Sequence, residues 1–151
     1  MQQQLAQLNS TLAAMPPVAA LGIAALEYAD HQLTLGAPLA ANINDKGNAF
    51  GGSLASILTL SGWGLVSLEL AAAGLQADVY VADSRVRYLA PLYGDLAATA
   101  QVAADADWGV FLQRFAQRGH ASIQLEAQVL ADGRPAATMS GRFVAKAKEP
   151  S

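Results

Sequence analysis

The chain has 151 residues, 53% of them hydrophobic and 14% charged, so it is long and apolar enough to form one domain with a substantial core. This composition excludes a disordered protein and suggests an oligomer that buries additional surface. The net charge of −3 argues against a general nucleic-acid-binding protein, and the absence of cysteine excludes disulfides, thiolate metal sites and cysteine nucleophiles.

The first part of the chain predicts a helix followed by two strands. Leucines recur at helical spacing within residues 1–14, and a proline pair then ends the helix. Residues 18–28 and 32–37 read as two pairing strands, joined by a turn at residues 29–31. No basic residue precedes the prolines, which argues against a signal peptide.

The most apolar stretch, residues 51–73, predicts a long central helix that ends at Gly74. The helix is apolar nearly all round, so we expect other elements to surround it. Its length would also suit a membrane span, but its serines, its glycines and Glu69 favour a buried core helix. Gly62 and Gly64 are costly inside a helix, which indicates the close approach of a strand or an acyl chain.

After this helix the hydrophobic period changes to two. Four strands are expected, at residues 77–90, 96–103, 121–130 and 136–146. A short helix capped by Asp107 is expected between the second and the third of them. In the first of them, one face is expected to carry Tyr80, Ala82, Val86 and Tyr88, and the other Val79, Val81, Asp83, Arg85 and Arg87. The element order predicts a single α+β domain over residues 1–151, with an antiparallel sheet curled around the central helix and a frayed tail at residues 147–151.

The polar loop before the central helix is the candidate site. Gly51 and Gly52 leave the first amides of the helix unobstructed, and these N–H groups favour an oxygen with partial negative charge. Asp45 is a candidate base, and Asn44 is able to orient a water molecule or a carbonyl group. The alternative is structural, since Asn42, Asn44 and Asp45 are also residues that build turns and cap helices.

Other chemistry has little support in the sequence. No zinc signature, Walker loop or dinucleotide fingerprint is present, so we expect neither a metal nor a bound cofactor. The run Gly51-Gly52-Ser53-Leu54-Ala55 is one residue short of a nucleophile elbow and follows a polar loop, so Ser53 is interpreted as a first-turn hydroxyl. His31 and His120 are expected at the surface.

The loop NINDKGNAFGG resembles the H-N-x-x-G-x-x-H-G-G pattern of the hotdog-fold thioesterases. The later stretch SRVRYLAPLYGD resembles the strand that follows the central helix in that family. In particular, the chain resembles a small bacterial subfamily of thioesterase-like proteins, some joined to an acetyltransferase domain, which share G-x-A-F-G-G-S-L and a Gly-Trp-Gly in the helix. The resemblance implies a hotdog fold, in which about five to six antiparallel strands wrap around the long helix.

The resemblance also implies a function with an unusual set of residues. Ile43 and Phe50 replace both histidines of the pattern, and Thr59 stands where many relatives carry an acidic catalyst. The implied activity is a cytoplasmic acyl-CoA hydrolase in which Gly52, with Gly51, polarises the thioester carbonyl. Asp45 would then deprotonate water that Asn44 and Thr59 hold. Expected substrate contacts are Asn42, Phe50, Ser53, Ser61 and Trp63, with Lys46, Arg85 and Arg87 for the nucleotide phosphates.

The implied assembly is a homodimer or a dimer of dimers, in which the loop of one subunit faces Thr59 and Ser61 of the other. Coenzyme A enters only as part of the substrate, and neither nucleic acid nor a membrane is an expected partner. Because the helix acid is missing, a non-catalytic module that binds acyl-CoA or an acylated carrier is the alternative. A dehydratase is a weaker third possibility, since it would need a histidine in the site.

Overall fold

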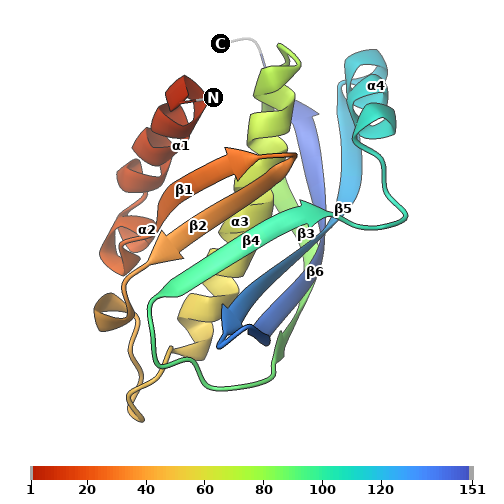
Figure 1. The fold of residues 1–151 in the computed structure, drawn as a ribbon. Coiled ribbons are helices and arrows are strands. Elements are labelled where there is room, and N and C mark those ends of the chain that lie inside the picture. The colour runs from red at the N-terminus through yellow and green to blue at the C-terminus, as the bar shows by residue number, and fades with distance from the viewer. Residues whose placement is uncertain (1, 150–151) are drawn as a thin grey trace.

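The structure is a computed structural model, and it describes residues 2–149. Six antiparallel strands form one sheet in the order β1-β2-β4-β5-β6-β3, and the long helix α3 packs against one face of it (Figure 1). The strands are β1 (Ala24–Ala29), β2 (Gln32–Ala37), β3 (Ala77–Tyr88), β4 (Leu96–Val102), β5 (His120–Ala131) and β6 (Arg134–Ala147). The helices are α1 (Gln2–Ala14), α2 (Pro16–Leu21), η1 (Leu39–Ala41), α3 (Gly51–Ala72) and α4 (Trp108–Arg118).

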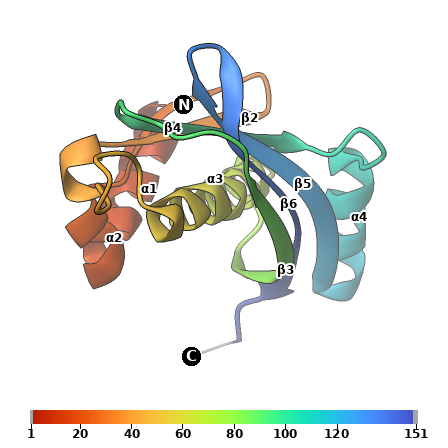
Figure 2. The same ribbon diagram turned by 90° about the horizontal axis from the view of Figure 1, so that it is seen from below.

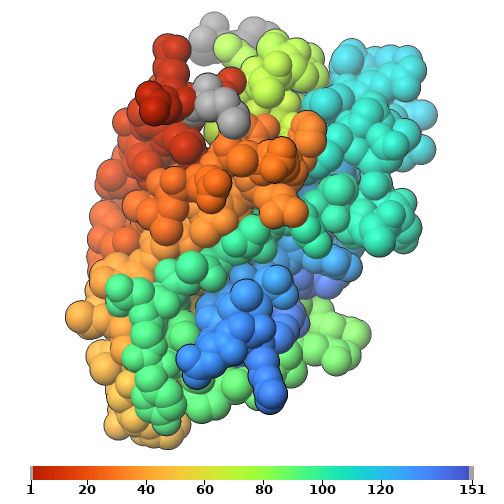
Figure 3. All heavy atoms as spheres, in the orientation of Figure 1, coloured from red at the N-terminus to blue at the C-terminus, as the bar shows by residue number. Residues whose placement is uncertain are grey.

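The sheet curves around α3, which confirms the predicted α+β architecture of a helix inside an antiparallel sheet (Figure 2). Strands β1, β2 and β4 cover the middle of the helix (Figure 3), while α1 and α2 lie at its side and α4 packs outside β5. Among residues 2–149, α3 is the one helix long and apolar enough to span a membrane. Its burial inside the sheet marks it as the core helix.

The glycines of α3 are explained by close packing. A Cβ atom on Gly62 would lie 2.5 Å from Cζ of Phe143, and one on Gly64 would lie 2.7 Å from Cδ2 of Leu33. Both of those side chains are fully buried. The helix therefore approaches strands β6 and β2 as closely as the sequence indicated, and protein side chains fill the space that Cβ atoms would take.

Two details differ from the sequence-based prediction. Residues 16–21 form a helix, because a proline is preorganised for the first helical turn and Gly22, with φ of 69°, then ends it. The strand predicted over residues 18–28 is therefore limited to β1. The frayed tail was predicted at residues 147–151. Ala147 instead belongs to β6, and residues 150–151 lie outside the described residues.

The second difference is a β-bulge in β3. The register shifts between Val81 and Asp83, so the extra residue Ala82 reverses the alternation of the strand. Val79 and Val81 consequently share the α3-facing side with Val86 and Tyr88, opposite the alternate residues Ala145, Phe143, Met139 and Ala137 of β6. The prediction that the two valines share a face with the arginines was wrong.

A buried carboxylate ties the β1–β2 hairpin to α3. Glu69 is 4% exposed, and its Oε1 lies 2.5 Å from Nδ1 of His31 in the turn. Burial, followed by the negative charge of Glu69 and its hydrogen-bonding influence, raises the pKa of Tyr28 to about 12. The side chain of His31 is 68% exposed, as expected of a turn residue.

Candidate functional site

The loop before α3 is held together mainly by one asparagine. The side-chain Oδ1 of Asn44 accepts hydrogen bonds from the backbone amides of Lys46 and Asn48, at 2.8 and 3.1 Å. Its Nδ2 donates to Oδ1 of Asn48 and to the carbonyl oxygen of Ala49. Gly47, with φ of 83°, closes the turn. Asn44 thus uses its hydrogen-bonding groups within the loop, as the structural alternative anticipated.

Asn42 fixes the other end of this loop. Its Nδ2 donates to the carbonyl oxygens of Leu21 and Pro38, at 2.8 and 2.7 Å, and its own backbone carbonyl accepts from the amide of Phe50. The residue is 3% exposed, so it anchors the loop against the end of α2 from inside the protein. Together these bonds set the position from which α3 begins.

The start of α3 presents free backbone donors. Leu54 makes the first intrahelical bond, to the carbonyl of Phe50, whose side chain provides no cap. Within residues 2–149, the amides of Gly51, Gly52 and Ser53 have no hydrogen-bond acceptor. These N–H groups lie at the positive end of the dipole of a 22-residue helix, which favours an oxygen atom carrying negative charge.

A cavity of about 330 Å³ adjoins the first of these residues, Gly51. Gly51 lies in its wall with Asn48 and Tyr88, and a Cβ atom on Gly51 would be 3.5 Å from Cε1 of Tyr88. The ring of Phe50 lies over the second glycine, since a Cβ atom on Gly52 would be 2.6 Å from its Cε2. Sequence reasoning did not place Tyr88 in the site, although the bulge-corrected alternation of β3 points it toward α3.

Asp45 lies at the outer tip of the loop. Its side chain is 81% exposed, and its Oδ1 is 2.8 Å from Nζ of Lys46. The hydrogen bond from Lys46, followed by its positive charge, lowers the pKa of Asp45 below its ordinary value. A carboxylate of lowered pKa is a weaker base. Because the side chain is also open to solvent, a second surface would have to cover this loop to hold a water molecule against Asp45.

The predicted α3 residues occupy different environments. Thr59 is half-buried in a groove of about 380 Å³ between α2 and α3, next to Val18 and Leu60. Trp63 is half-buried in a second groove, beside α1 and β3. Ser61 is fully buried and donates to the carbonyl of Leu58, at 2.7 Å, and Ser53 is 2% exposed. The single chain therefore leaves Thr59 and Trp63 accessible and encloses both serines.

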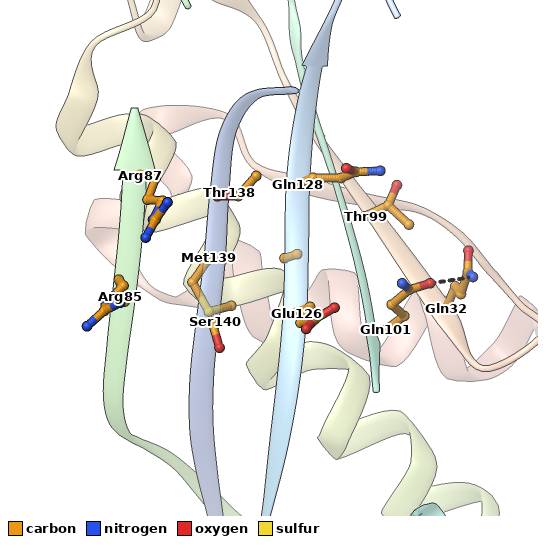
Figure 4. Close-up of a pocket in the computed structure, with 11 residues that line it drawn as sticks. Gln32, Arg85, Arg87, Thr99, Gln101, Glu126, Gln128, Thr138, Met139 and Ser140 are labelled. Atoms are coloured by element: carbon orange, nitrogen blue, oxygen red, sulfur yellow. Dashed lines mark hydrogen bonds between the residues drawn. The ribbon is translucent and has the colours of Figure 1, made fainter. Parts of the chain in front are cut away.

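Arg85 and Arg87 lie apart from the helix start. The β3 register puts them on the sheet face opposite α3, where they line a cavity of about 490 Å³ (Figure 4). Lys46 belongs to the loop and does not line this cavity. The structure thus separates the three predicted phosphate ligands into two groups. In residues 2–149, no group of three or more histidine, aspartate or glutamate side chains is arranged to hold a metal ion.

Comparison with known proteins adds the family to this geometry. Residues 5–147 match the family described as "Putative thioesterase (yiiD_Cterm)". The chain belongs to this thioesterase family. Its six-stranded sheet and long central helix are those of the hotdog-fold proteins of known structure that it resembles.

Solved structures share this fold, and one at 32% identity is described as a putative thioesterase. A protein described as a putative thioesterase from Shewanella oneidensis is 32% identical, with a TM-score of 0.87 over 97% of this chain and 99% of the other. A protein of unknown function from Chlorobaculum tepidum is 27% identical, with a TM-score of 0.91 over 97% and 96% of the two chains. A probable thioesterase from Pseudomonas aeruginosa, at 20% identity and a TM-score of 0.75, shares the fold over 95% of each chain.

Proposed function

We propose that this protein hydrolyses acyl thioesters, with acyl-CoA as the first substrate class to test, in the cytoplasm. The observation that carries the proposal is the pair of unpartnered amides at Gly51, which lines a cavity, and at the adjoining Gly52, in a member of a thioesterase family. Water would add to the thioester carbonyl carbon, and these amides would bind the resulting oxyanion. Collapse of the intermediate would then break the carbon–sulfur bond. One such donor typically contributes about 10²–10³ in kcat.

Asp45 is the proposed general base, and it would return its proton to the leaving thiolate. Asn44 acts here as a positioning residue, because its bonds to the amides of Lys46 and Asn48 fix the loop on either side. Lys46 is the proposed contact for a substrate phosphate, since its exposed ammonium lies in the same loop. A phosphate there would compete with Asp45 for the ammonium group and so release the carboxylate.

A homodimer would supply the missing second surface. Strand β3 forms one end of the sheet, and its outer edge pairs with no strand among residues 2–149. The exposed Tyr80, Val81 and Tyr88 lie on this strand, and an unprotected edge of this length favours pairing with another chain. We propose that two β3 strands pair, so that the loop of one protomer faces Thr59 of the partner subunit. Two such dimers would form the proposed dimer of dimers.

The deciding experiment is thiol release from a series of acyl-CoA esters. Replacement of Asp45 by Asn should lower kcat/KM by about 100-fold or more, whereas Asp105→Asn, which removes an equal charge from the exposed surface, should leave it unchanged. Both variants should retain the circular dichroism spectrum and melting temperature of the parent. Full turnover in Asp45→Asn would exclude Asp45 as the base while leaving the proposed role of the amide donors intact.

The dimer has its own test. Light scattering on a sizing column should give twice the chain mass for the parent and a shift toward monomer for Val81→Lys, which places a charge on the edge strand. The matched control is Leu130→Lys, which introduces the same charge at an exposed site on β5 and should leave the mass unchanged. Loss of turnover together with dimer mass would support a site shared between subunits. A monomeric parent with full turnover would exclude it.

A second candidate function is an acyl-thioester binding module without turnover. The pairing of Asp45 with Lys46 favours it, because that bond lowers the pKa of the carboxylate, which is also exposed in the single chain. Stabilisation by CoA esters in a thermal-shift titration, without any release of thiol, would select this function over the enzyme.

A further inference from the structure

The outer face of the sheet, on the side away from α3, carries a polar trough of about 490 Å³ (Figure 4). We use the name outer trough for two rows of side chains that cross the strands in register. The first row comprises Arg85, Ser140, Glu126 and Gln101. The second comprises Arg87, Thr138, Gln128 and Thr99.

The cationic end of the outer trough lies on β3. Arg85 and Arg87 are two residues apart on one strand, so their backbones are separated by about 7 Å and both side chains rise from the same face. Within residues 2–149 neither guanidinium has a carboxylate partner, although Arg142 in the adjacent row is paired with Asp83 at 3.2 Å. Two adjacent, uncompensated guanidinium groups are the arrangement that binds phosphate oxygens through paired N–H donors.

The opposite end of the outer trough suits hydroxyl and amino groups. Glu126 follows Arg85 across two strand spacings, which is about 9.5 Å between backbones, and among residues 2–149 its carboxylate forms no ion pair with the guanidinium. Gln101 is already hydrogen-bonded to Gln32, at 2.9 Å, and these amides form the far wall. Between the ends lie Ser140 and Thr138, which offer hydroxyl groups.

We propose that the outer trough is a binding site for a phosphate-bearing polar molecule of the ribose-phosphate kind. Its phosphate lies against Arg85 and Arg87, and its hydroxyl or amino donors reach Glu126. No aromatic side chain is among the described residues that line the trough, so hydrogen bonds rather than base stacking provide the recognition. The site is separate from the α3 amides, because the sheet lies between them.

The ribose phosphate has two possible sources, which are the nucleotide half of coenzyme A and a free nucleotide. Isothermal titration calorimetry on the whole chain distinguishes them with three probes: adenosine 3′,5′-bisphosphate, free coenzyme A and adenosine. We expect the bisphosphate to bind saturably and adenosine not to bind. The double variant Arg85→Gln/Arg87→Gln should weaken bisphosphate binding by about tenfold or more.

The matched control removes two other exposed arginines, in the variant Arg118→Gln/Arg134→Gln, and should keep bisphosphate binding within about twofold of the parent. Glu126→Gln should retain binding of inorganic phosphate and lose the preference for the bisphosphate over it. If coenzyme A loses affinity in parallel with the bisphosphate, the trough holds the substrate nucleotide; if coenzyme A binding persists, the trough holds a free nucleotide.

The proposal is overturned if the parent shows no saturable bisphosphate binding, or if the Arg85/Arg87 variant and the control lose affinity equally. Equal losses would mean that net charge alone attracts the anion. These readouts do not involve turnover, so a failure of the proposed hydrolase activity leaves the result for the outer trough interpretable.

Discussion

Replacing Gly62 by alanine tests whether α3 and β6 are in the close contact that the structure describes. The new Cβ atom would lie 2.5 Å from Cζ and 2.7 Å from Cε2 of Phe143, a ring that is fully buried. Overpacking of this kind costs up to about 3 kcal/mol. The higher helix propensity of alanine offsets about 1 kcal/mol of that cost.

The net expectation is a loss of about 2 kcal/mol in the free energy of unfolding. For a chain of this size that loss corresponds to a fall of about 4–8 °C in the melting temperature. Urea unfolding followed by circular dichroism gives the free energy, and calorimetry gives the melting temperature. Phe143→Leu in the same chain makes room for the methyl group, so the double variant should be more stable than the sum of the two single losses by about 1–2 kcal/mol.

A Gly62→Ala protein as stable as the parent would refute this reasoning, because the propensity gain would then match or exceed the packing cost. Additive losses in the double variant would also refute it, since they would show that position 62 and Phe143 do not compete for one space. Reversibility of unfolding is checked for each variant, so that aggregation is not mistaken for lost stability.

Three further outcomes are expected. The pKa of Tyr28 is about 12 in the folded chain against an ordinary 10.0. The stability that the neutral phenol contributes is therefore complete below pH 10.0 and is lost as the pH rises toward 12. In urea unfolding over that pH range, the free energy of unfolding should fall less for a Tyr28→Phe variant than for the parent. His31→Ala leaves the buried Glu69 without one partner and should cost about 1–3 kcal/mol in the same assay, whereas replacing the exposed His120 by Ala should cost less than about 0.5 kcal/mol. If Asp45 is the base, its lowered pKa should keep kcat/KM level across the pH range in which a histidine titrates, and an acid limb at about pH 6.5 in a pH–rate profile would point to histidine instead.

The sequence predicted the architecture well because each element carried its own signals. The αL residue Gly74 marks the end of α3, and Asp107 caps α4 by accepting a hydrogen bond from the amide of Val110. The turn at Asp132 and Gly133, both with positive φ, joins β5 and β6, which correspond to the strands predicted at residues 121–130 and 136–146. Such features depend on a few neighbouring residues, which is why they can be recognised without a structure.

The sequence predicted less where a local pattern admits two structures. The stretch from Pro16 is apolar enough for a strand, but two prolines at its start and Gly22 at its end also suit a short helix. The structure has the helix. The bulge at Ala82 was missed although the sequence carries a signal for it, because the apolar residues move from odd positions before it, Val79 and Val81, to even positions after it, Val86 and Tyr88.

The candidate site was predicted only in part, because some of its features are local and others depend on the folded loop. Free amides at Gly51 and Gly52 follow from the glycines and the helix start, which are local features. The use of Asn44 inside the loop and the exposure of Asp45 depend on how the loop folds back on itself. Whether Asp45 meets a substrate depends on a second protein surface, and this stays a prediction.

The single additional residue at Ala82 decides what each side of β3 can do. Without it, the strand could still keep every backbone bond to β6, but the valines and the arginines would share one face. If the arginines then faced outward, Val79 and Val81 would point to water. If the valines faced inward, the arginines would enter the core. The hydrophobic interior and the charged exterior are compatible only because the strand is one residue longer than its partner requires. In a relative that lacks this insertion, the apolar and charged residues of this strand should therefore alternate without a break along its whole length.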